Sequence, residues 1–176
     1  METSIKSNGI NYGLYLGGTL SLLTVIAYAV NLDLFTKWWY GIGLMILVIV
    51  FGIISSMSSK KLLGGFINFK GAFSSYFITV AIGIVISSVV SYIVFNVIDP
   101  EAATLLQEKI LDSQVEMMRG FNAPEDAIAQ VVEQMEKEDN MFALSKVLQS
   151  IAFQLIGFSV VGLIVALVVK KDNPEA

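Results

Sequence analysis

Four long runs of apolar residues, each free of Asp, Glu, Lys and Arg, constrain the fold more than any other feature of the sequence. They are Ile10 to Leu32, Tyr40 to Met57, Ala72 to Ile98 and Val147 to Val169. At about 1.5 Å per residue, a helix of about 20 residues crosses a hydrocarbon core of about 30 Å. Within lipid, the backbone must satisfy its own hydrogen bonds, and a helix does so. We therefore predict an all-α membrane protein with four transmembrane helices.

One long segment, Asp99 to Lys146, interrupts these runs and divides the spans three to one. Asp99-Pro100-Glu101 is typical of a helix start, with a capping carboxylate, a proline at the first position and an acid near the positive helix end. Gly120 offers a stop, and Asn122 to Glu125 restarts the pattern. Apolar residues share one face in each half: Ala103, Leu106, Ile110, Met117 and Phe121, then Ile128, Val131, Val132, Met135 and Phe142. The insert is predicted to be a hairpin of two amphipathic helices, the second continuous with the fourth span.

The insert is strongly acidic. It carries eleven acidic residues and four basic ones, a net charge of −7, whereas the whole chain carries −4. Helices that lie flat on anionic lipid normally present Lys and Arg, so the acids favour a hairpin packed on itself or on a partner. A docking surface for another membrane or periplasmic protein would use Glu125, Asp126, Glu133 and Glu136. Glu133, Glu136, Glu138 and Asp139 are a weaker candidate for calcium or magnesium, because they lack the ordered ligand spacing and the glycine turn.

The residue types that are missing exclude much familiar chemistry. The chain has no Cys and no His, which excludes disulfides, thiolate or imidazole metal ligands and the usual nucleophile pairs. The acidic balance argues against nucleic-acid binding. We predict no catalytic, cofactor-binding or metal-ligating residue and do not expect an enzyme. A lipid-modifying activity is a distant alternative, since Asp33, Asp99 and Lys70 are better explained as helix flanks and caps.

Lysines in the short connections predict the orientation. Six lie on the side of the termini and the Ser58 to Gly71 connection: Lys6, Lys60, Lys61, Lys70, Lys170 and Lys171. The other short connection has only Lys37. The positive-inside rule then places both termini in the cytoplasm and the insert outside. Ala27-Tyr28-Ala29 resembles a signal-peptidase site, but the apolar run continues past it, so we expect an uncleaved span. The parts are residues 1–98, 99–146 and 147–176, within one domain.

Small and polar residues inside the spans predict how the helices meet. Gly9, Gly13 and Gly17 on the first span, and Gly83, Ser87 and Ser91 on the third, have the spacing that lets helix backbones approach closely. Packing within one bundle is the preferred interpretation, and a homodimer seam is the alternative. A polar stripe of Ser87, Ser88, Ser91 and Asn96, with Gln149 and Gln154, either lines a path or makes interhelical hydrogen bonds. Charge is absent from every predicted span, which argues against coupled transport, proton relays and voltage sensing.

Three motifs resemble a known family. They are the first span with Gly9, Tyr12, Gly13 and Gly17, the segment Gly65 to Phe73, and Ile98-Asp99-Pro100. Together they resemble the bacterial membrane family labelled domain of unknown function 4199. The resemblance implies a four-span inner-membrane protein with a helical insert between spans three and four. It implies no activity, substrate, cofactor or site residue.

Two functional hypotheses remain. The first is a non-enzymatic scaffold or accessory subunit that binds a partner through its acidic insert. The second is a passive pore or small-solute permease, oligomeric, that uses the polar stripe of the third span.

Overall fold

The computed structural model describes residues 2–137 and 140–172, and most of this part of the chain is helical. The elements are α1 (Glu2–Val30), the 3₁₀-helix η1 (Leu32–Thr36), α2 (Trp38–Leu62), α3 (Phe69–Tyr92), the π-helix η2 (Ile93–Ile98), α4 (Pro100–Gly120), α5 (Glu125–Lys137) and α6 (Leu144–Val169). Four helices are long and apolar enough to cross a membrane, namely α1, α2, α3 with η2, and α6. The predicted class, an all-α membrane protein with four spans and a two-helix insert, is confirmed.

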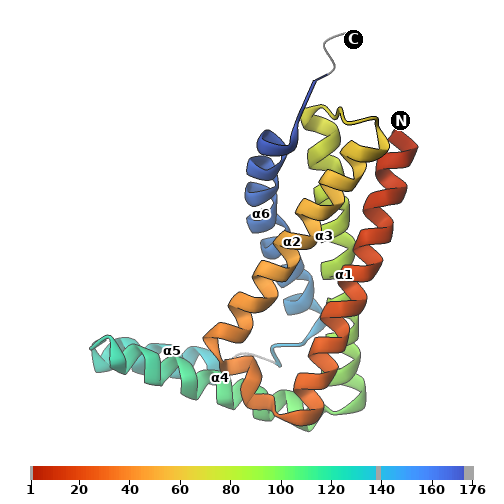
Figure 1. The fold of residues 1–176 in the computed structure, drawn as a ribbon. Coiled ribbons are helices and arrows are strands. Elements are labelled where there is room, and N and C mark those ends of the chain that lie inside the picture. Colours follow the sequence, from red (N-terminus) through yellow and green to blue (C-terminus); the bar gives the residue numbers. More distant parts are fainter. Residues whose placement is uncertain (1, 138–139, 173–176) are drawn as a thin grey trace.

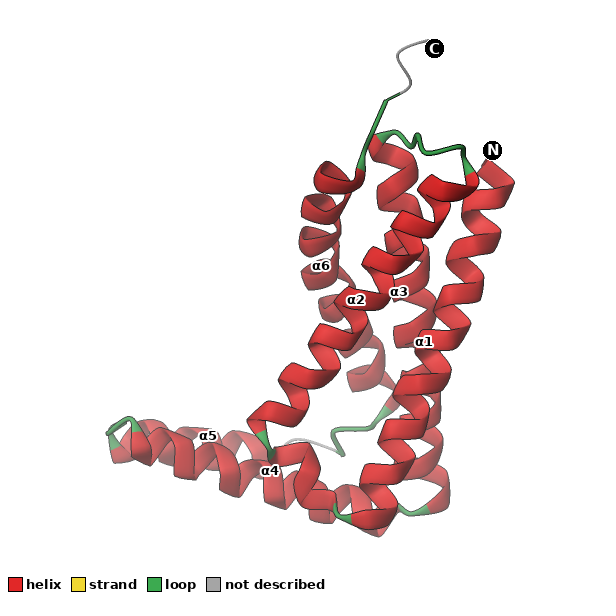
Figure 2. Ribbon diagram, in the orientation of Figure 1, coloured by secondary structure: helices red, strands yellow, loops and turns green. Residues whose placement is uncertain are grey.

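The four spans form an upright bundle with α3 at its centre, in contact with α1, α2 and α6 (Figure 1). Helix α1 begins and α6 ends at the same end of the bundle, which we call the terminal end. The α4–α5 hairpin, which we call the arm, leaves the opposite end and runs across the direction of the spans (Figure 2). We call this opposite end the arm end. The bundle and the arm are thus two distinct parts of one molecule.

Glycines bring α1 against α3 along most of the bundle. A Cβ atom added to Gly13 would lie 2.7 Å from Cβ of Ile82, closer than real Cβ atoms approach. Gly9 faces Ile78 and Gly17 faces Ile86 in the same way. The predicted small-residue register on the first span therefore lies at a contact inside the bundle, where a larger residue would push the two helices apart.

Tyr76 of α3 joins three spans at the terminal half of the bundle. Its side chain is fully buried. A Cβ atom added to Gly52 of α2 would lie 2.4 Å from Cε2 of this ring, and one added to Gly162 of α6 would lie 2.6 Å from Cδ1. The absence of side chains at these two glycines is what leaves room for the ring between α2 and α6.

The helices at the terminal end are longer than the sequence predicts. Helix α1 already begins at Glu2, and α2 continues to Leu62, through residues predicted as a connection. The physical reason is that their polar ends pair: the Asn8 amide nitrogen donates to Ser59 Oγ at 2.8 Å and to the Ser55 carbonyl at 3.1 Å. Helix α2 ends just before a glycine pair, where Gly64 and Gly65 have φ of 74° and 91°, a conformation that glycine adopts readily.

The insert begins as predicted but ends differently. Asp99 Oδ1 accepts a hydrogen bond from the Ala102 N–H at 2.9 Å, and Pro100 is the first residue of α4. The prediction that the second helix extends through Phe142 and continues into the fourth span was wrong. Helix α5 ends at Lys137, and α6 begins at Leu144 rather than Val147. The Phe142 ring instead stacks on Phe95, with 4.3 Å between centroids, and this contact turns the chain back toward the bundle.

Candidate functional site

A cleft of about 370 Å³ lies among the spans in the half of the bundle nearer the arm. Its polar lining consists of Ser87, Ser88 and Ser91 from α3 and Ser150 and Gln154 from α6. Leu20 of α1, residues of α2 such as Met45, and Met141 and Phe142 at the end of the insert complete the wall. This size is within the range of small-molecule sites. The hydroxyl and amide groups give the cleft donors and acceptors but no charge.

The polar stripe predicted from the sequence is only partly gathered in this cleft. Ser87, Ser88, Ser91 and Gln154 line it. Asn96 instead ties the insert to η2, since its side-chain nitrogen donates to the Phe142 carbonyl at 2.6 Å. Gln149 is exposed and does not line the cleft. Gly83, predicted in one register with Ser87 and Ser91, faces Leu16 of α1, so that register divides between a helix contact and the cleft.

A buried hydroxyl network holds the spans together at the terminal side of the cleft. Ser75 Oγ lies 2.9 Å from Ser55 Oγ and 2.8 Å from Ser59 Oγ. Thr79 Oγ1 lies 2.7 Å from Ser55 Oγ and 3.1 Å from the Gly9 carbonyl, where its hydroxyl can donate. All four side chains are fully buried. The network thus connects α1, α2 and α3 through groups that have partners, as buried polar groups require.

Sequence reasoning missed this network, although the sequence contained a signal for it. Ser55 and Ser59 are four residues apart on α2, and Ser75 and Thr79 are four apart on α3. That spacing places each pair on one helix face. The two faces then meet across the same level of the bundle.

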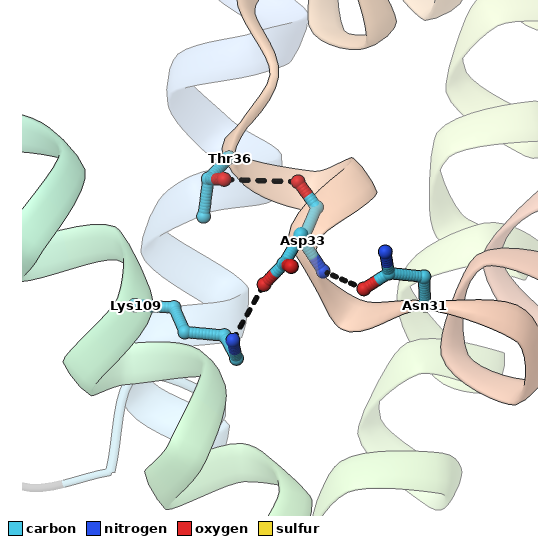
Figure 3. A network of polar contacts seen from close by, with 4 residues as sticks. All are labelled: Asn31, Asp33, Thr36 and Lys109. Atoms are coloured by element: carbon cyan, nitrogen blue, oxygen red, sulfur yellow. Dashed lines mark hydrogen bonds and ion pairs between the residues drawn. The ribbon is translucent and has the colours of Figure 1, made fainter.

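The arm is fixed to the bundle by an ion pair between α4 and η1 (Figure 3). Lys109 Nζ lies 2.5 Å from Asp33 Oδ1. Asp33 is itself positioned locally, because its N–H donates to Asn31 Oδ1 at 2.8 Å and its carbonyl accepts from the Thr36 hydroxyl at 2.9 Å. The ammonium group of Lys109 is the main cause that lowers the pKa of Asp33 below its ordinary value.

A second anchor joins the start of α4 to α1. The Tyr28 hydroxyl donates to Asp99 Oδ2 at 2.8 Å, while the other carboxylate oxygen caps α4. The pKa of Asp99 is lowered, chiefly by the Ala102 N–H and next by the Tyr28 hydroxyl. Below these polar contacts, Phe95 and Leu106 are fully buried in an apolar cluster. The first half of α4 is therefore held by charge, hydrogen bonds and packing together.

The outer part of the arm presents its acids to solvent. Glu125, Asp126 and Glu133 are exposed on α5, and Glu133 pairs with Lys137 one turn away. The Glu136 side chain, and Glu138 and Asp139 as whole residues, lie outside the described parts of the chain. Among the residues that the structure describes, no group of three His, Cys, Asp or Glu is placed to hold a metal ion. Ile128 is buried against α4, which leaves the acidic face of α5 uncovered.

The comparison with protein families matches residues 11–171 to the model described as protein of unknown function (DUF4199). The chain belongs to the DUF4199 family. No curated protein and no solved structure gives a significant match. In this DUF4199 protein the matched range contains the arm, the cleft and nearly all of the four spans.

In this DUF4199 chain, two of the three residues considered for a lipid-modifying activity make structural contacts. Asp33 pairs with Lys109, and Asp99 caps α4. Lys70 lies in the first turn of α3 and is exposed. These three residues come from different parts of the fold: Asp33 and Asp99 lie at the arm end, and Lys70 lies at the terminal end.

Proposed function

We propose that this protein is a non-enzymatic scaffold or accessory subunit of a membrane complex, and that the acidic face of its arm binds a basic surface of a partner protein. The observation that supports this proposal is the way the arm is attached. Helix α4 contacts η1 and η2, whereas α5 packs on α4 alone among the described elements with substantial contacts. A hairpin held at one end and acidic along its free part offers a charged surface without disturbing the bundle.

The partner is expected to be basic because the free part of the arm is acidic. Glu125, Asp126 and Glu133 are exposed, and Lys137 is the basic residue nearest to them on α5. Complementary charge at such a surface speeds association and selects partners more than it adds affinity. The excess of lysine on the other side of the spans supports an arm outside the cytoplasm, which in a bacterial inner membrane is the periplasm.

Site-specific photo-crosslinking in native membranes tests this proposal. A crosslinking amino acid at Gln130, which is exposed on α5, should capture one recurrent protein. Neutralising Glu125, Asp126, Glu133 and Glu136 to the corresponding amides should abolish that capture. The matched control neutralises an equal number of acids on α4, namely Glu101, Glu108, Asp112 and Glu116, and should retain it. Capture that persists unchanged in the α5 variant would contradict binding through this face.

The cleft supports a second candidate function, a binding site or pathway for a small polar solute. Its serines and Gln154 offer hydrogen bonds within a space of about 370 Å³. Toward the terminal end, however, fully buried side chains, including Tyr76 and Thr79, fill the bundle. A pathway would therefore need a second conformation or an assembly of several copies.

Flux measurements in liposomes test the second candidate. The double variant Ser87→Leu with Ser91→Leu fills the cleft with apolar groups and should reduce the flux of small polar solutes. Ser145→Leu, an exposed position outside the cleft, is the matched control. Liposomes that show no flux with either the native protein or the variants would exclude a pathway.

A further inference from the structure

The level of α4 relative to the membrane is fixed by the chain on both sides of it. The third span ends at Ile98, and only Asp99 separates it from Pro100, the first residue of α4. Helix α4 also packs on η1, a five-residue connection between two spans. The end of the third span and the connection η1 both lie at the boundary between hydrocarbon and water. Helix α4 therefore starts at the membrane surface rather than at a distance from it.

Two tryptophans mark the same level. Trp38 and Trp39 open α2 directly after η1, with 76% and 53% of their surface exposed. Exposed Trp at the end of a span is typical of the interface, where its ring lies among the lipid headgroups. Because the arm runs across the spans at this end of the bundle (Figure 1), its length extends along the interface.

The apolar stripe of α4 continues past the edge of the bundle. In the first half of the helix, Leu106 and Ile110 pack on the end of the bundle. Met117 follows Ile110 by two helical turns and Phe121 by three, so all of them share one face. Beyond the bundle this face is uncovered, and Met117 is 57% and Phe121 81% exposed. The side of α4 that faces the spans thus carries large apolar groups where lipid would lie.

The acids of α4 occupy the opposite side. Glu101, Glu108 and Asp112 are exposed, and their spacing of seven and four places them on one face, turned away from the stripe. From these observations we propose that the arm lies on the surface of the same bilayer that holds the spans, with Met117 and Phe121 reaching the acyl chains just below the headgroups and the acids in water. This inference does not depend on the proposed partner.

The acidic charge of the arm does not oppose this arrangement. A free amphipathic helix needs basic residues to be attracted to anionic lipid. The arm is instead joined covalently to two spans and held by the Asp33–Lys109 ion pair, so attraction to the membrane is not required. The expectation that acidic helices avoid a lipid surface applies to a helix in solution. It does not apply to one that begins at the interface with its acids pointing outward.

Nitroxide accessibility tests the proposal directly, because the chain contains no Cys and each label can be placed alone. The full chain is reconstituted in phosphatidylcholine vesicles with a single cysteine in place of Met117, Phe121, Glu108 or Asp112. Ile164→Cys, on the exposed surface of α6, provides the reference for lipid. At Met117 and Phe121, collisions with oxygen should exceed those with a water-soluble nickel chelate, as at Ile164. At Glu108 and Asp112 the order should reverse.

Two results would overturn the proposal. The first is equal access of the nickel chelate to labels at Phe121 and Asp112, which would place the stripe in water. The second is dipolar broadening between labels at Phe121 that persists at high lipid-to-protein ratio, which would mean that a second copy of the chain covers the stripe. All the substituted side chains are exposed, so these variants are expected to fold.

Discussion

The terminal end and the arm end of the bundle are built differently, although the same four helices run through both. At the terminal end, small and hydroxyl-bearing residues bring the helices close, and side chains such as Tyr76 and Ser75 are fully buried. At the arm end, a cleft opens among the spans, and the arm is attached along only part of its length. The difference teaches that the closest helix packing lies at one end of the bundle, whereas the cleft and the uncovered part of the arm lie toward the other.

The largest effect is expected where the terminal end is most tightly packed. In Gly52→Ala the new Cβ would lie 2.4 Å from the Tyr76 ring, which has no free space between α2 and α6. Overpacking of this kind costs about 1–3 kcal/mol. Thermal unfolding in detergent micelles should show the loss. Gly43→Ala, on the same helix with no atom within 4 Å of the new Cβ, is the control and should be no less stable than the native protein. Equal unfolding temperatures for the two variants would contradict the packing argument.

A smaller loss is expected from the hydroxyl network. Ser75→Ala removes the group that bridges Ser55 and Ser59. Interhelical hydrogen bonds in membrane proteins contribute about 0.6 kcal/mol on average and at most about 1.7 kcal/mol, so the loss should lie between these values. Ser74→Ala, at the preceding and only half-buried position, should change the free energy of unfolding little. The free energy of unfolding measured by steric trapping in bicelles compares the two. If Ser75→Ala has the same free energy of unfolding as the native protein, the hydroxyl network does not stabilise the bundle.

Acid should loosen the arm before it affects the bundle. The pKa values of Asp33 and Asp99 are both lowered in the folded chain. Their contribution to anchoring is therefore complete above the unfolded value of about 3.9 and is lost as the pH falls through the folded values. Hydrogen exchange in the first turns of α4 should accelerate below pH of about 4, once rates are corrected for intrinsic pH dependence, while exchange in the centre of α3 stays slow.

A matched pair of variants separates the anchor from a general effect of acid. Asp33→Asn should accelerate exchange in α4 already at neutral pH, because Lys109 loses its charged partner. Asp112→Asn, exposed on the outer face of α4, should leave it unchanged. If both variants behave like the native protein at neutral pH, the ion pair does not hold the arm.

The smallest effect is expected in the cleft. Ser87→Leu places an apolar side chain into an open space of about 370 Å³ rather than into a packed contact. The free energy of unfolding should change by no more than about 0.5 kcal/mol, as at surface positions. Steric trapping should therefore rank Ser87→Leu well below Gly52→Ala. A loss as large as that of Gly52→Ala would mean that the two ends of the bundle are packed alike.

The sequence predicted the spans and the start of the arm because each depends on local chemistry. Within a bilayer, an uncharged apolar run of this length satisfies its own backbone hydrogen bonds by forming a helix. Asp99 and Pro100 supply a cap and a first turn without help from distant residues.

Features that depend on distant contacts were not predicted. Asn8 is helical because Ser59 lies beside it, and Phe142 leaves the helix because Phe95 offers a stacking surface. At the tip of the arm, Gly120 ends α4 as expected, but the left-handed residue is Asn122, with φ of 54°. The cleft could not be predicted for another reason. A stripe of serines on a helix has the same sequence whether the neighbouring helices pack against it or leave a cleft beside it.

The partial attachment of α4 also has a mechanical consequence. Ile110 is the last residue of α4 in the apolar cluster at the end of the bundle, and the ten residues that follow it extend about 15 Å at 1.5 Å per residue. If the arm moves as a rigid body, it turns about the contacts near Lys109. A rotation of the arm by about 10° at these contacts would move its tip by about 3 Å, given a rigid helix of that length. A small rotation of the arm at η1 would thus become a larger displacement at Phe121, and the Asp33–Lys109 ion pair lies at the point where the two parts meet.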